Sequence, residues 1–201
     1  MGSPQTLVIA RLIGELERKS LPDELTAVKE AIKLACKVHE TQLRDDGAPY
    51  VLHPLRVAYM LVHEFGIRDI DTICAGLLHD AVEDGESISL DQIERNFGMP
   101  IAAMIGSLTK PPKNDRTHAE INAEYFPRIR QSNAQVRIIK LADRLDNIRD
   151  LPNSPNEAKR RRMLEETKKF YLPLINSLED RKLGAMFAGA YARAIKEIQH
   201  E

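Results

Sequence analysis

Five ionisable side chains follow directly on an apolar run in the stretch AGLLHDAVEDGE, residues 75–86. They are one imidazole and four carboxylates: His79, Asp80, Glu83, Asp84 and Glu86. Neighbouring carboxylates repel one another unless a cation or a proton compensates their charge. Imidazole nitrogen and carboxylate oxygen are ligands that Mn²⁺, Fe²⁺ and Zn²⁺ accept. We therefore predict that His79 and Asp80 form half of a metal site; the alternative is an ordinary helix end with a hydrogen-bonded histidine and a solvated aspartate.

The other half of the site is predicted by two ionisable residues that also border apolar helix faces. His53 opens the segment HPLRVAYML, and Asp143 follows KLA in VRIIKLADRLDNIRDL. A carboxylate partly buried against a core is unstable unless a cation or hydrogen-bond donors compensate it. The predicted ligands of one metal ion are therefore His53, His79, Asp80 and Asp143. His39 is expected to be a histidine without a role in the site. The alternative is that it lies behind one of the predicted ligands and supports it.

These ligands need rigid elements to hold them, and the apolar pattern predicts helices almost throughout. Apolar residues recur three and four positions apart over most of the chain, whereas strand signals are nearly absent. The predicted helices span about residues 7–19, 25–42, 53–65, 71–84, 90–97, 100–110, 116–131, 134–151, 155–178 and 180–199. The polar, proline-containing segment 111–118 is the best candidate for a mobile connection. We expect one all-α domain over residues 1–201, a bundle of about nine or ten helices.

The composition excludes several classes of protein. The 201-residue chain is 43% hydrophobic and 29% charged, as in globular rather than disordered proteins. Its net charge of −1 gives no overall basic surface for nucleic acid or a membrane. No apolar run approaches the roughly 18 residues of a membrane span. The two cysteines, Cys36 and Cys74, stand in apolar helical settings, which favours reduced core thiols and a cytoplasmic protein.

Five motifs, in this order, resemble the hydrolase domain of the Rel/Spo alarmone enzymes, a branch of the HD superfamily of metal-dependent phosphohydrolases. They are RDDGAPYVLHPLRVA, AGLLHDAVEDGE, IERNFG, IIKLADRLDNIRDL and ETKKFYLPLINSL. The resemblance implies an HD-domain helical bundle with one Mn²⁺ that removes the 3′-diphosphate of ppGpp or pppGpp, giving GDP or GTP and pyrophosphate. Because no residues remain for a synthetase domain or a regulatory tail, the chain resembles a stand-alone small alarmone hydrolase. Its expected partner is a small nucleotide, and a homo-oligomer is compatible with the sequence.

The resemblance also implies which residues handle water. Glu83 and Asp84 match the acidic pair of the family, and in a helix that continues past Asp80 each lies one turn beyond a ligand. Their expected role is to orient and deprotonate the attacking water. A solvated acidic helix end is the alternative.

A substrate with two diphosphates requires cations from the protein. Lys140 and Arg144 are expected to contact phosphate, and Arg44 is expected to contact phosphate or stack on the base. Lys110, Lys113 and Arg149 are further candidates, although solvated surface side chains are the alternative for the two lysines. The full set of expected substrate contacts is Arg44, Asp46, Lys140, Arg144, Asn147, Thr167 and Tyr171.

Two acidic residues depart from the family pattern. Asp45 stands where the family has a lysine, which removes one expected phosphate-facing cation. Asp146, in RLDN, stands where the family has histidine or tyrosine. A carboxylate such as Asp46 or Asp146 could accept hydrogen bonds from guanine N1–H and N2–H or from adenine N6–H. The choice between ppGpp and ppApp therefore stays open.

Two other functions remain as alternatives to alarmone hydrolysis. The first is a general HD-domain nucleotidase, against which the acidic pair and the loop YVLHP argue. The second is a catalytically inactive nucleotide sensor, which predicts loss of a ligand or of the acidic pair. All six of these residues are present: His53, His79, Asp80, Glu83, Asp84 and Asp143.

Overall fold

The fold is helical throughout the part of the chain that the computed structural model describes, namely residues 3–18, 22–84, 88–178 and 180–199 with only the backbone of Asp84. The α-helices are α1 (Pro4–Glu17), α2 (Pro22–Val38), α3 (Leu52–His63), α4 (Ile70–Leu78), α5 (Ala81–Asp84), α6 (Leu90–Phe97), α7 (Met99–Leu108), α8 (His118–Gln131), α9 (Ala134–Asp150), α10 (Glu157–Glu166), α11 (Leu172–Asn176) and α12 (Arg181–Gln199). Ten of these have eight residues or more, which confirms the predicted all-α bundle within these residues. None of the described helices is long and apolar enough to cross a membrane.

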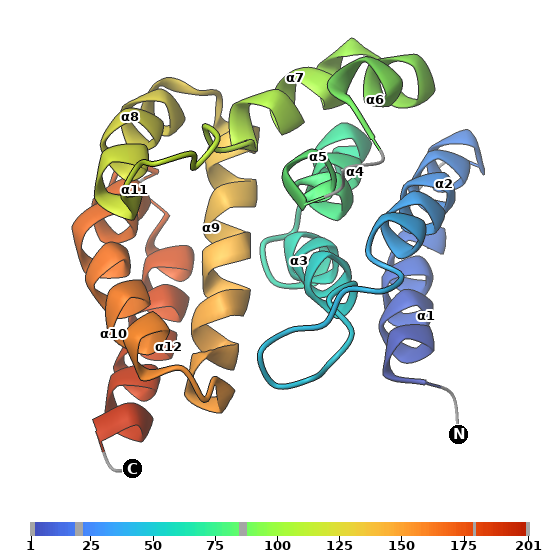
Figure 1. Cartoon of the computed structure of the whole chain (residues 1–201). Helices are drawn as coiled ribbons and strands as arrows, with labels where there is room; N and C mark the ends of the chain where they lie inside the picture. Colours follow the sequence, from blue (N-terminus) through green and yellow to red (C-terminus); the bar gives the residue numbers. More distant parts are fainter. Residues whose placement is uncertain (1–2, 19–21, 85–87, 179, 200–201) are drawn as a thin grey trace.

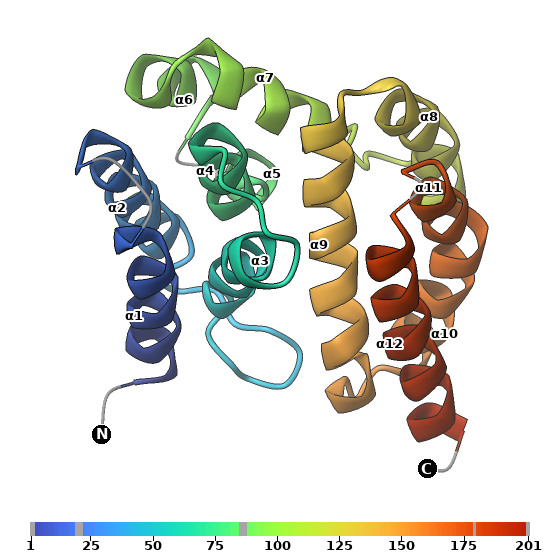
Figure 2. The same ribbon diagram turned by 180° about the vertical axis from the view of Figure 1, so that it is seen from behind.

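Helix α9 runs through the middle of the molecule (Figure 1). Helices α3 and α4 pack against it from one side and α12 from another, and α7 and α8 also contact it. Helices α1 and α2 cover α3 and α4 on the outside, as the view from behind also shows (Figure 2). Most of the buried apolar residues, from Leu12 to Ala194, form one contiguous cluster, in which each large side chain stabilises the fold by about 1.5–3 kcal/mol. Because α9 touches both sides of this core, it can bring residues from distant segments together.

Helix α4 is fixed closely against α3. Asp69 caps its first turn by accepting a hydrogen bond from the backbone N–H of Thr72 at 3.0 Å. Seven of its nine residues are buried. At Gly76 the two helices approach so closely that a Cβ atom would lie 2.6 Å from Leu61 Cδ1. Glycine at this position therefore lets the C-terminal end of α4 sit deep in the core.

The helix predicted to continue to residue 84 breaks after Leu78, so that prediction is wrong. His79 is the C-cap of α4, and a turn through Asp80 leads into the separate helix α5. The i,i+4 relation expected between the ligands and the acidic pair is therefore absent. Instead the turn brings His79 Nε2 within 4.0 Å of Asp143 on α9. Glu86 lies outside the described residues.

The helix predicted over residues 155–178 is also interrupted. Between α10 and α11 lies a π-helical turn, η2 (Thr167–Tyr171), and α11 contains Pro173 at its second position. Proline has no backbone N–H, and in a regular helix its ring would clash with the carbonyl four residues earlier, so the chain widens before it. This widened turn buries both Thr167 and Tyr171.

Candidate active site

Four predicted metal ligands converge beside α9. The ligand atoms of His53, on α3, and of His79 and Asp80, after α4, all lie within 4.8 Å of one another. Asp143, on α9, places Oδ1 3.3 Å from His53 Nε2 and 4.0 Å from His79 Nε2. The side chains of the two histidines are 2% exposed and that of Asp143 10%. Residues from three separate segments thus form one buried cluster of nitrogen and oxygen donors.

Both histidine rings are oriented through Nδ1. His79 Nδ1 donates to the carbonyl of Gly76 at 2.9 Å, and His53 Nδ1 donates to Asp146 Oδ2 at 2.7 Å. Nε2 of each ring therefore faces the predicted carboxylate ligands. His79 Nε2 is buried and, although 3.1 Å from Asp80 Oδ2, has no hydrogen-bond partner among the described residues. Two imidazoles and two carboxylates arranged in this way fit a divalent cation.

The carboxylates favour positive charge between the two rings. Burial lowers the pKa of His53, but the hydrogen bonds and charges of Asp143 and Asp146 outweigh it and raise this pKa to about 9. Burial also lowers the pKa of His79, yet the negative charge of Asp80, 3.1 Å from Nε2, raises it above its usual value. The site is therefore electrostatically suited to a cation.

Asp146 lies behind His53 and is nearly enclosed, with 4% of its surface exposed. Arg56 donates to both of its oxygens, from Nε at 2.7 Å and from Nη2 at 2.9 Å. The hypothesis that Asp146 accepts hydrogen bonds from a nucleobase is therefore wrong, because both of its oxygens already have donors. Spacing gives only a partial signal: Arg56 is three residues beyond His53 and Asp146 three beyond Asp143, so each pair shares a helix face, but the packing of one helix on the other is not visible in the sequence.

Asp80 is also held by Tyr50, whose hydroxyl donates to Oδ2 at 2.7 Å. The ring of His39 packs on Tyr50 with centroids 4.9 Å apart, and His39 is 1% exposed. His39 thus lies one side chain behind a ligand, which was the less favoured alternative for this residue. Buried aromatic packing here restrains Asp80 through its hydrogen bond.

Asp80 and Asp143 open onto a cleft of about 690 Å³. Glu83 lines the same cleft, where Lys110 approaches it with Nζ at 3.3 Å and with its backbone N–H at 3.4 Å. Glu83 therefore lines the same cleft as Asp80 and Asp143 despite the break in the helix. The side chain of Asp84 lies outside the described residues.

Four of the predicted phosphate-binding cations, Lys110, Lys113, Lys140 and Arg144, line this cleft, whereas Arg149 does not. Lys140 is buried and donates to Asp143 Oδ2 at 2.8 Å. Arg144 donates through Nη2 to Tyr171 at 3.0 Å and to Glu166 at 3.1 Å, whereas its buried Nη1 has no partner among the described residues. Arg149 instead forms a bidentate ion pair with Glu64 outside the cleft, so its prediction as a phosphate contact is wrong.

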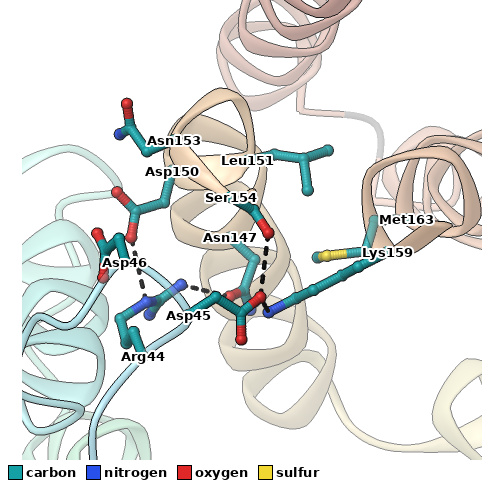
Figure 3. A pocket seen from close by; sticks show the side chains of 10 residues that line it. All are labelled: Arg44, Asp45, Asp46, Asn147, Asp150, Leu151, Asn153, Ser154, Lys159 and Met163. Atoms are coloured by element: carbon teal, nitrogen blue, oxygen red, sulfur yellow. Dashed lines mark hydrogen bonds and ion pairs between the residues drawn. The ribbon is translucent and has the colours of Figure 1, made fainter. Parts of the chain in front are cut away.

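A smaller pocket adjoins the cleft, and Figure 3 shows the side chains that line it. In it Arg44 donates to Asn147 Oδ1 at 3.0 Å and lies 3.2 Å from Asp150. Asn147 Nδ2 in turn donates to Asp143 Oδ1 at 2.6 Å. Hydrogen bonds therefore connect this pocket directly to the metal-ligand cluster. The residues that line both cavities are Asn147, Lys159 and Met163.

The two aspartates of the loop that carries Arg44 have different partners. Asp45 Oδ2 accepts from Lys159 Nζ at 2.6 Å and from Ser154 at 3.0 Å (Figure 3). Asp46 accepts from the N–H of Ala48 at 3.0 Å and lines the small pocket, where a substrate contact was predicted. Lys159 on α10 thus compensates the charge of Asp45. The sequence alone does not reveal this pair, because its members are 114 residues apart.

The three remaining predicted contacts differ in their access to the cleft. Asn147 and Tyr171 line it. Thr167 is fully buried, and its hydroxyl donates to the carbonyl of Met163 at 2.6 Å. Thr167 therefore supports the π-helical turn, and its prediction as a substrate contact is wrong.

The comparisons with known proteins agree on one family. An HD domain matches residues 31–179. Human guanosine-3′,5′-bis(diphosphate) 3′-pyrophosphohydrolase MESH1 is 38% identical over 133 residues, which cover 64% of this chain and 71% of the human protein. A solved structure, described as a metazoan ortholog of SpoT that hydrolyses ppGpp, has a TM-score of 0.74 at 26% identity, covering 83% of this chain and 94% of that one.

In longer relatives, the region similar to this chain is only one part of the protein. The bifunctional (p)ppGpp synthase/hydrolase SpoT of Escherichia coli is 34% identical over 200 residues, which are 92% of this chain and 28% of that protein. A chloroplastic relative from rice is matched over 18% of its length. The chain therefore spans less than a third of these relatives.

Proposed function

Since this chain belongs to the HD-domain family, and within it to the relatives of the guanosine-3′,5′-bis(diphosphate) 3′-pyrophosphohydrolases, we propose that it hydrolyses the 3′-diphosphate of alarmone nucleotides. The products are pyrophosphate and GDP or GTP, or their adenine counterparts. The observation that carries the proposal is the buried cluster of His53, His79, Asp80 and Asp143, whose two carboxylates open onto a cleft with Glu83 in its wall.

The metal we propose for this cluster is Mn²⁺, held by His53, His79, Asp80 and Asp143. The support is the donor set and the buried Nε2 of His79, which has no other partner among the described residues. When bound, such an ion lowers the pKa of a water molecule and offsets the charge of the diphosphate. The protein contributes the orientation of the ligands, through Gly76 and Asp146 at the rings and Tyr50 at Asp80.

Water attacks the phosphorus next to the 3′ oxygen, and the bond between that phosphorus and the 3′ oxygen breaks. Glu83 accepts the proton of the attacking water, because its carboxylate lines the cleft beside the ligands. Lys110 holds the Glu83 carboxylate in this position. We assign Asp84 to the same water as a prediction from the sequence. The 3′ oxygen takes up the proton that Glu83 accepted and becomes the hydroxyl of the nucleoside, and pyrophosphate departs with the oxygen of the attacking water.

The 3′-diphosphate needs donors that are not already used. Arg144 has a buried Nη1 without a partner among the described residues and lines the cleft beside Asp143. Its other nitrogen, Nη2, is fixed by Tyr171 and Glu166, so the guanidinium is oriented before a substrate arrives. Lys140 compensates Asp143 from the same helix. Arg144 is therefore our main phosphate donor.

We place the nucleobase over the mouth of the small pocket, beside Arg44, because the pocket itself encloses only about 20 Å³. The planar guanidinium of Arg44 can stack on a base there. Leu151 and Met163 supply apolar surface there. Asp46 accepts a hydrogen bond from Ala48 through Oδ1, which leaves Oδ2 to accept from an exocyclic amine. Both guanine and adenine carry such an amine, so we propose ppGpp and ppApp as the two substrates to compare.

The deciding experiment is hydrolysis of ppGpp and ppApp, side by side, by the purified protein with Mn²⁺. We expect pyrophosphate as the product, and loss of the reaction in Asp80→Ala. Release of orthophosphate or triphosphate from other nucleotides would instead identify a general nucleotidase. Binding without any turnover would identify a nucleotide sensor.

Because Cys36 and Cys74 are free thiols, a reducing compartment such as the cytoplasm is our proposed location.

A further inference from the structure

The wall of the cleft formed by α8, α10 and the segment before α8 carries an excess of positive charge. These elements lie across α9 from α3 and α4 (Figure 1). The cationic or potentially cationic side chains that line this wall are Lys110, Lys113, His118, Lys159 and Arg162. Among the described residues, one carboxylate, that of Glu166, lines the same wall.

Two of these cations are already compensated. Lys110 pairs with Glu83 at 3.3 Å, and Lys159 pairs with Asp45 at 2.6 Å. Each of these contacts takes up one positive charge near the edge of the cleft. Neither lysine is therefore the best candidate for a further anionic ligand.

Arg162 is compensated only weakly. Its Nε lies 3.9 Å from Glu166 Oε1, but Glu166 already accepts from Asn122 at 3.0 Å and from Arg144 at 3.1 Å. The side chain of Arg162 is 41% exposed, so it can turn into the cleft. Its positive charge is therefore available to a ligand.

Lys113 and His118 stand beside Arg162 without an ion pair among the described residues. Burial lowers the pKa of His118, and the positive charges of Arg162, Lys113 and Lys110 lower it further, against the opposing effect of Glu166. Arg162, Lys113 and Lys110 therefore lie close enough to His118 to disfavour its protonated form. The wall therefore attracts anions.

The other cations that line the two cavities are already paired or assigned. Lys140 donates to Asp143, and Arg44 lies 3.2 Å from Asp150. Arg144 is assigned to the 3′-diphosphate. The carboxylates of Asp80, Glu83 and Asp143 in the cleft add negative charge on that side. A second anionic arm of the substrate is therefore best stabilised on the wall with Arg162.

On the premise of the proposed function, the substrate carries phosphates on both its 3′ and its 5′ oxygens. With the 3′ arm beside Asp143 and the base beside Arg44, the 5′ arm remains to be placed. We propose that Lys113, His118 and Arg162 form a subsite for the 5′-polyphosphate of the nucleotide. The subsite makes the enzyme favour substrates with more 5′-phosphates.

The test uses nucleoside 3′-diphosphates that carry no, one, two or three 5′-phosphates, with the base that the protein prefers. For the unaltered protein kcat/KM should rise along this series. In Arg162→Ala the loss should grow with each 5′-phosphate and reach about tenfold for the 5′-triphosphate. Arg161→Ala is the matched control, because Arg161 is exposed on the same helix and lines neither of the two cavities.

Two results would overturn the subsite. One is a kcat/KM that does not depend on the 5′-phosphates in the unaltered protein. The other is an equal loss in Arg162→Ala for all four substrates, which would mean that Arg162 binds the 3′ arm or the released pyrophosphate.

A binding measurement separates this inference from the proposed function. GTP has the 5′ arm but no 3′-diphosphate, so its calorimetric affinity reports on the subsite even if no substrate is hydrolysed. About tenfold weaker GTP binding in Arg162→Ala than in Arg161→Ala would support the subsite. Equal GTP affinity in the two variants would refute it.

Discussion

Asp146 Oδ2 accepts the Nδ1–H of His53 at 2.7 Å, on the side of the ring away from the metal-ligand cluster. Arg56 holds both oxygens of the same carboxylate. A carboxylate behind a ligating imidazole fixes its tautomer and its orientation and makes it a stronger donor to a metal. The ion pair with Arg56 keeps the Asp146 charge from standing alone in the core.

Asp146→Asn should therefore weaken metal binding about 10- to 100-fold, because the amide keeps the shape but not the charge. Calorimetric titration of the metal-free protein with Mn²⁺ measures this change. Glu64→Gln is the matched control, since Glu64 forms a similar bidentate pair with Arg149 away from the cleft. Equal Mn²⁺ affinity in both variants would show that Asp146 has only a structural role.

Asp80 and Glu83 should differ in what they support. Asp80→Ala should lose both metal and activity, because Asp80 supplies a ligand atom to the cluster. Glu83→Gln should keep the metal and lose about 10²- to 10⁴-fold in kcat, because it removes the proton acceptor. Metal content and kcat measured on the same samples test the difference. If both variants lose the metal to the same degree, the separate roles are wrong.

Removal of the metal should destabilise the fold locally around the cluster. The metal binds the folded state, so an excess of Mn²⁺ at 100 times its dissociation constant stabilises the protein by about 2.7 kcal/mol. The melting temperature should accordingly fall with a chelator and recover with Mn²⁺. In Asp80→Ala it should respond to neither addition. A full response in that variant would place the metal elsewhere.

The ion pair between Asp45 and Lys159 predicts a pH dependence of stability. The hydrogen bond from Lys159 lowers the pKa of Asp45, more than burial raises it. A carboxyl group with a lowered pKa in the folded state stabilises the protein above its usual pKa of about 4 and loses this effect as pH falls through the folded-state value.

Asp45→Asn should thus be less stable than the unaltered protein at neutral pH, and the difference should shrink in acid. Urea unfolding at several pH values measures it. Glu30→Gln is the control, because its pair with Lys33 joins two exposed neighbours on one helix. A stability difference that is the same at every pH would contradict the ion pair.

Thr167→Val tests the reassignment of this residue from substrate contact to core. The variant loses one hydrogen bond to Met163 and should lower the free energy of unfolding by about 1 kcal/mol. KM should stay at the value of the unaltered protein, because the hydroxyl does not line the cleft. Thr26→Val, where the same type of bond to Pro22 is exposed, is the control for stability. A raised KM without a loss of stability would restore the original prediction.

The helical architecture and the convergence of His53, His79, Asp80 and Asp143 could be predicted because each signal is local. His53, His79 and Asp143 each stand beside an apolar helix face, and that setting is visible within a few residues. The contacts behind the site could not be predicted in the same way. Arg56 and Asp146 are 90 residues apart, and their pairing depends on how α3 packs against α9.

The breaks in the helices were missed for a related reason. Residues 71–84 have a continuous helical pattern, yet the chain turns at His79, where the end of α4 meets α9. For residues 155–178 the sequence does contain a signal that the helix is interrupted, because Pro173 excludes a regular helix around it. The π-helical form of the turn depends on the packing of Tyr171 against Phe126 and Arg144, which no local pattern contains.

Helix α9 carries a predicted metal ligand, our proposed phosphate donor and the hydrogen-bond partner of His53 within four consecutive positions, Asp143 to Asp146. Successive residues of a helix point about 100° apart, so a deletion of one residue earlier in α9 would turn all three away together. A shift of the α9 backbone would therefore change the positions of all three side chains at once. Redesign of substrate preference is therefore best directed at α10 and the loop that carries Arg44, which border the cavities but supply none of the proposed ligands.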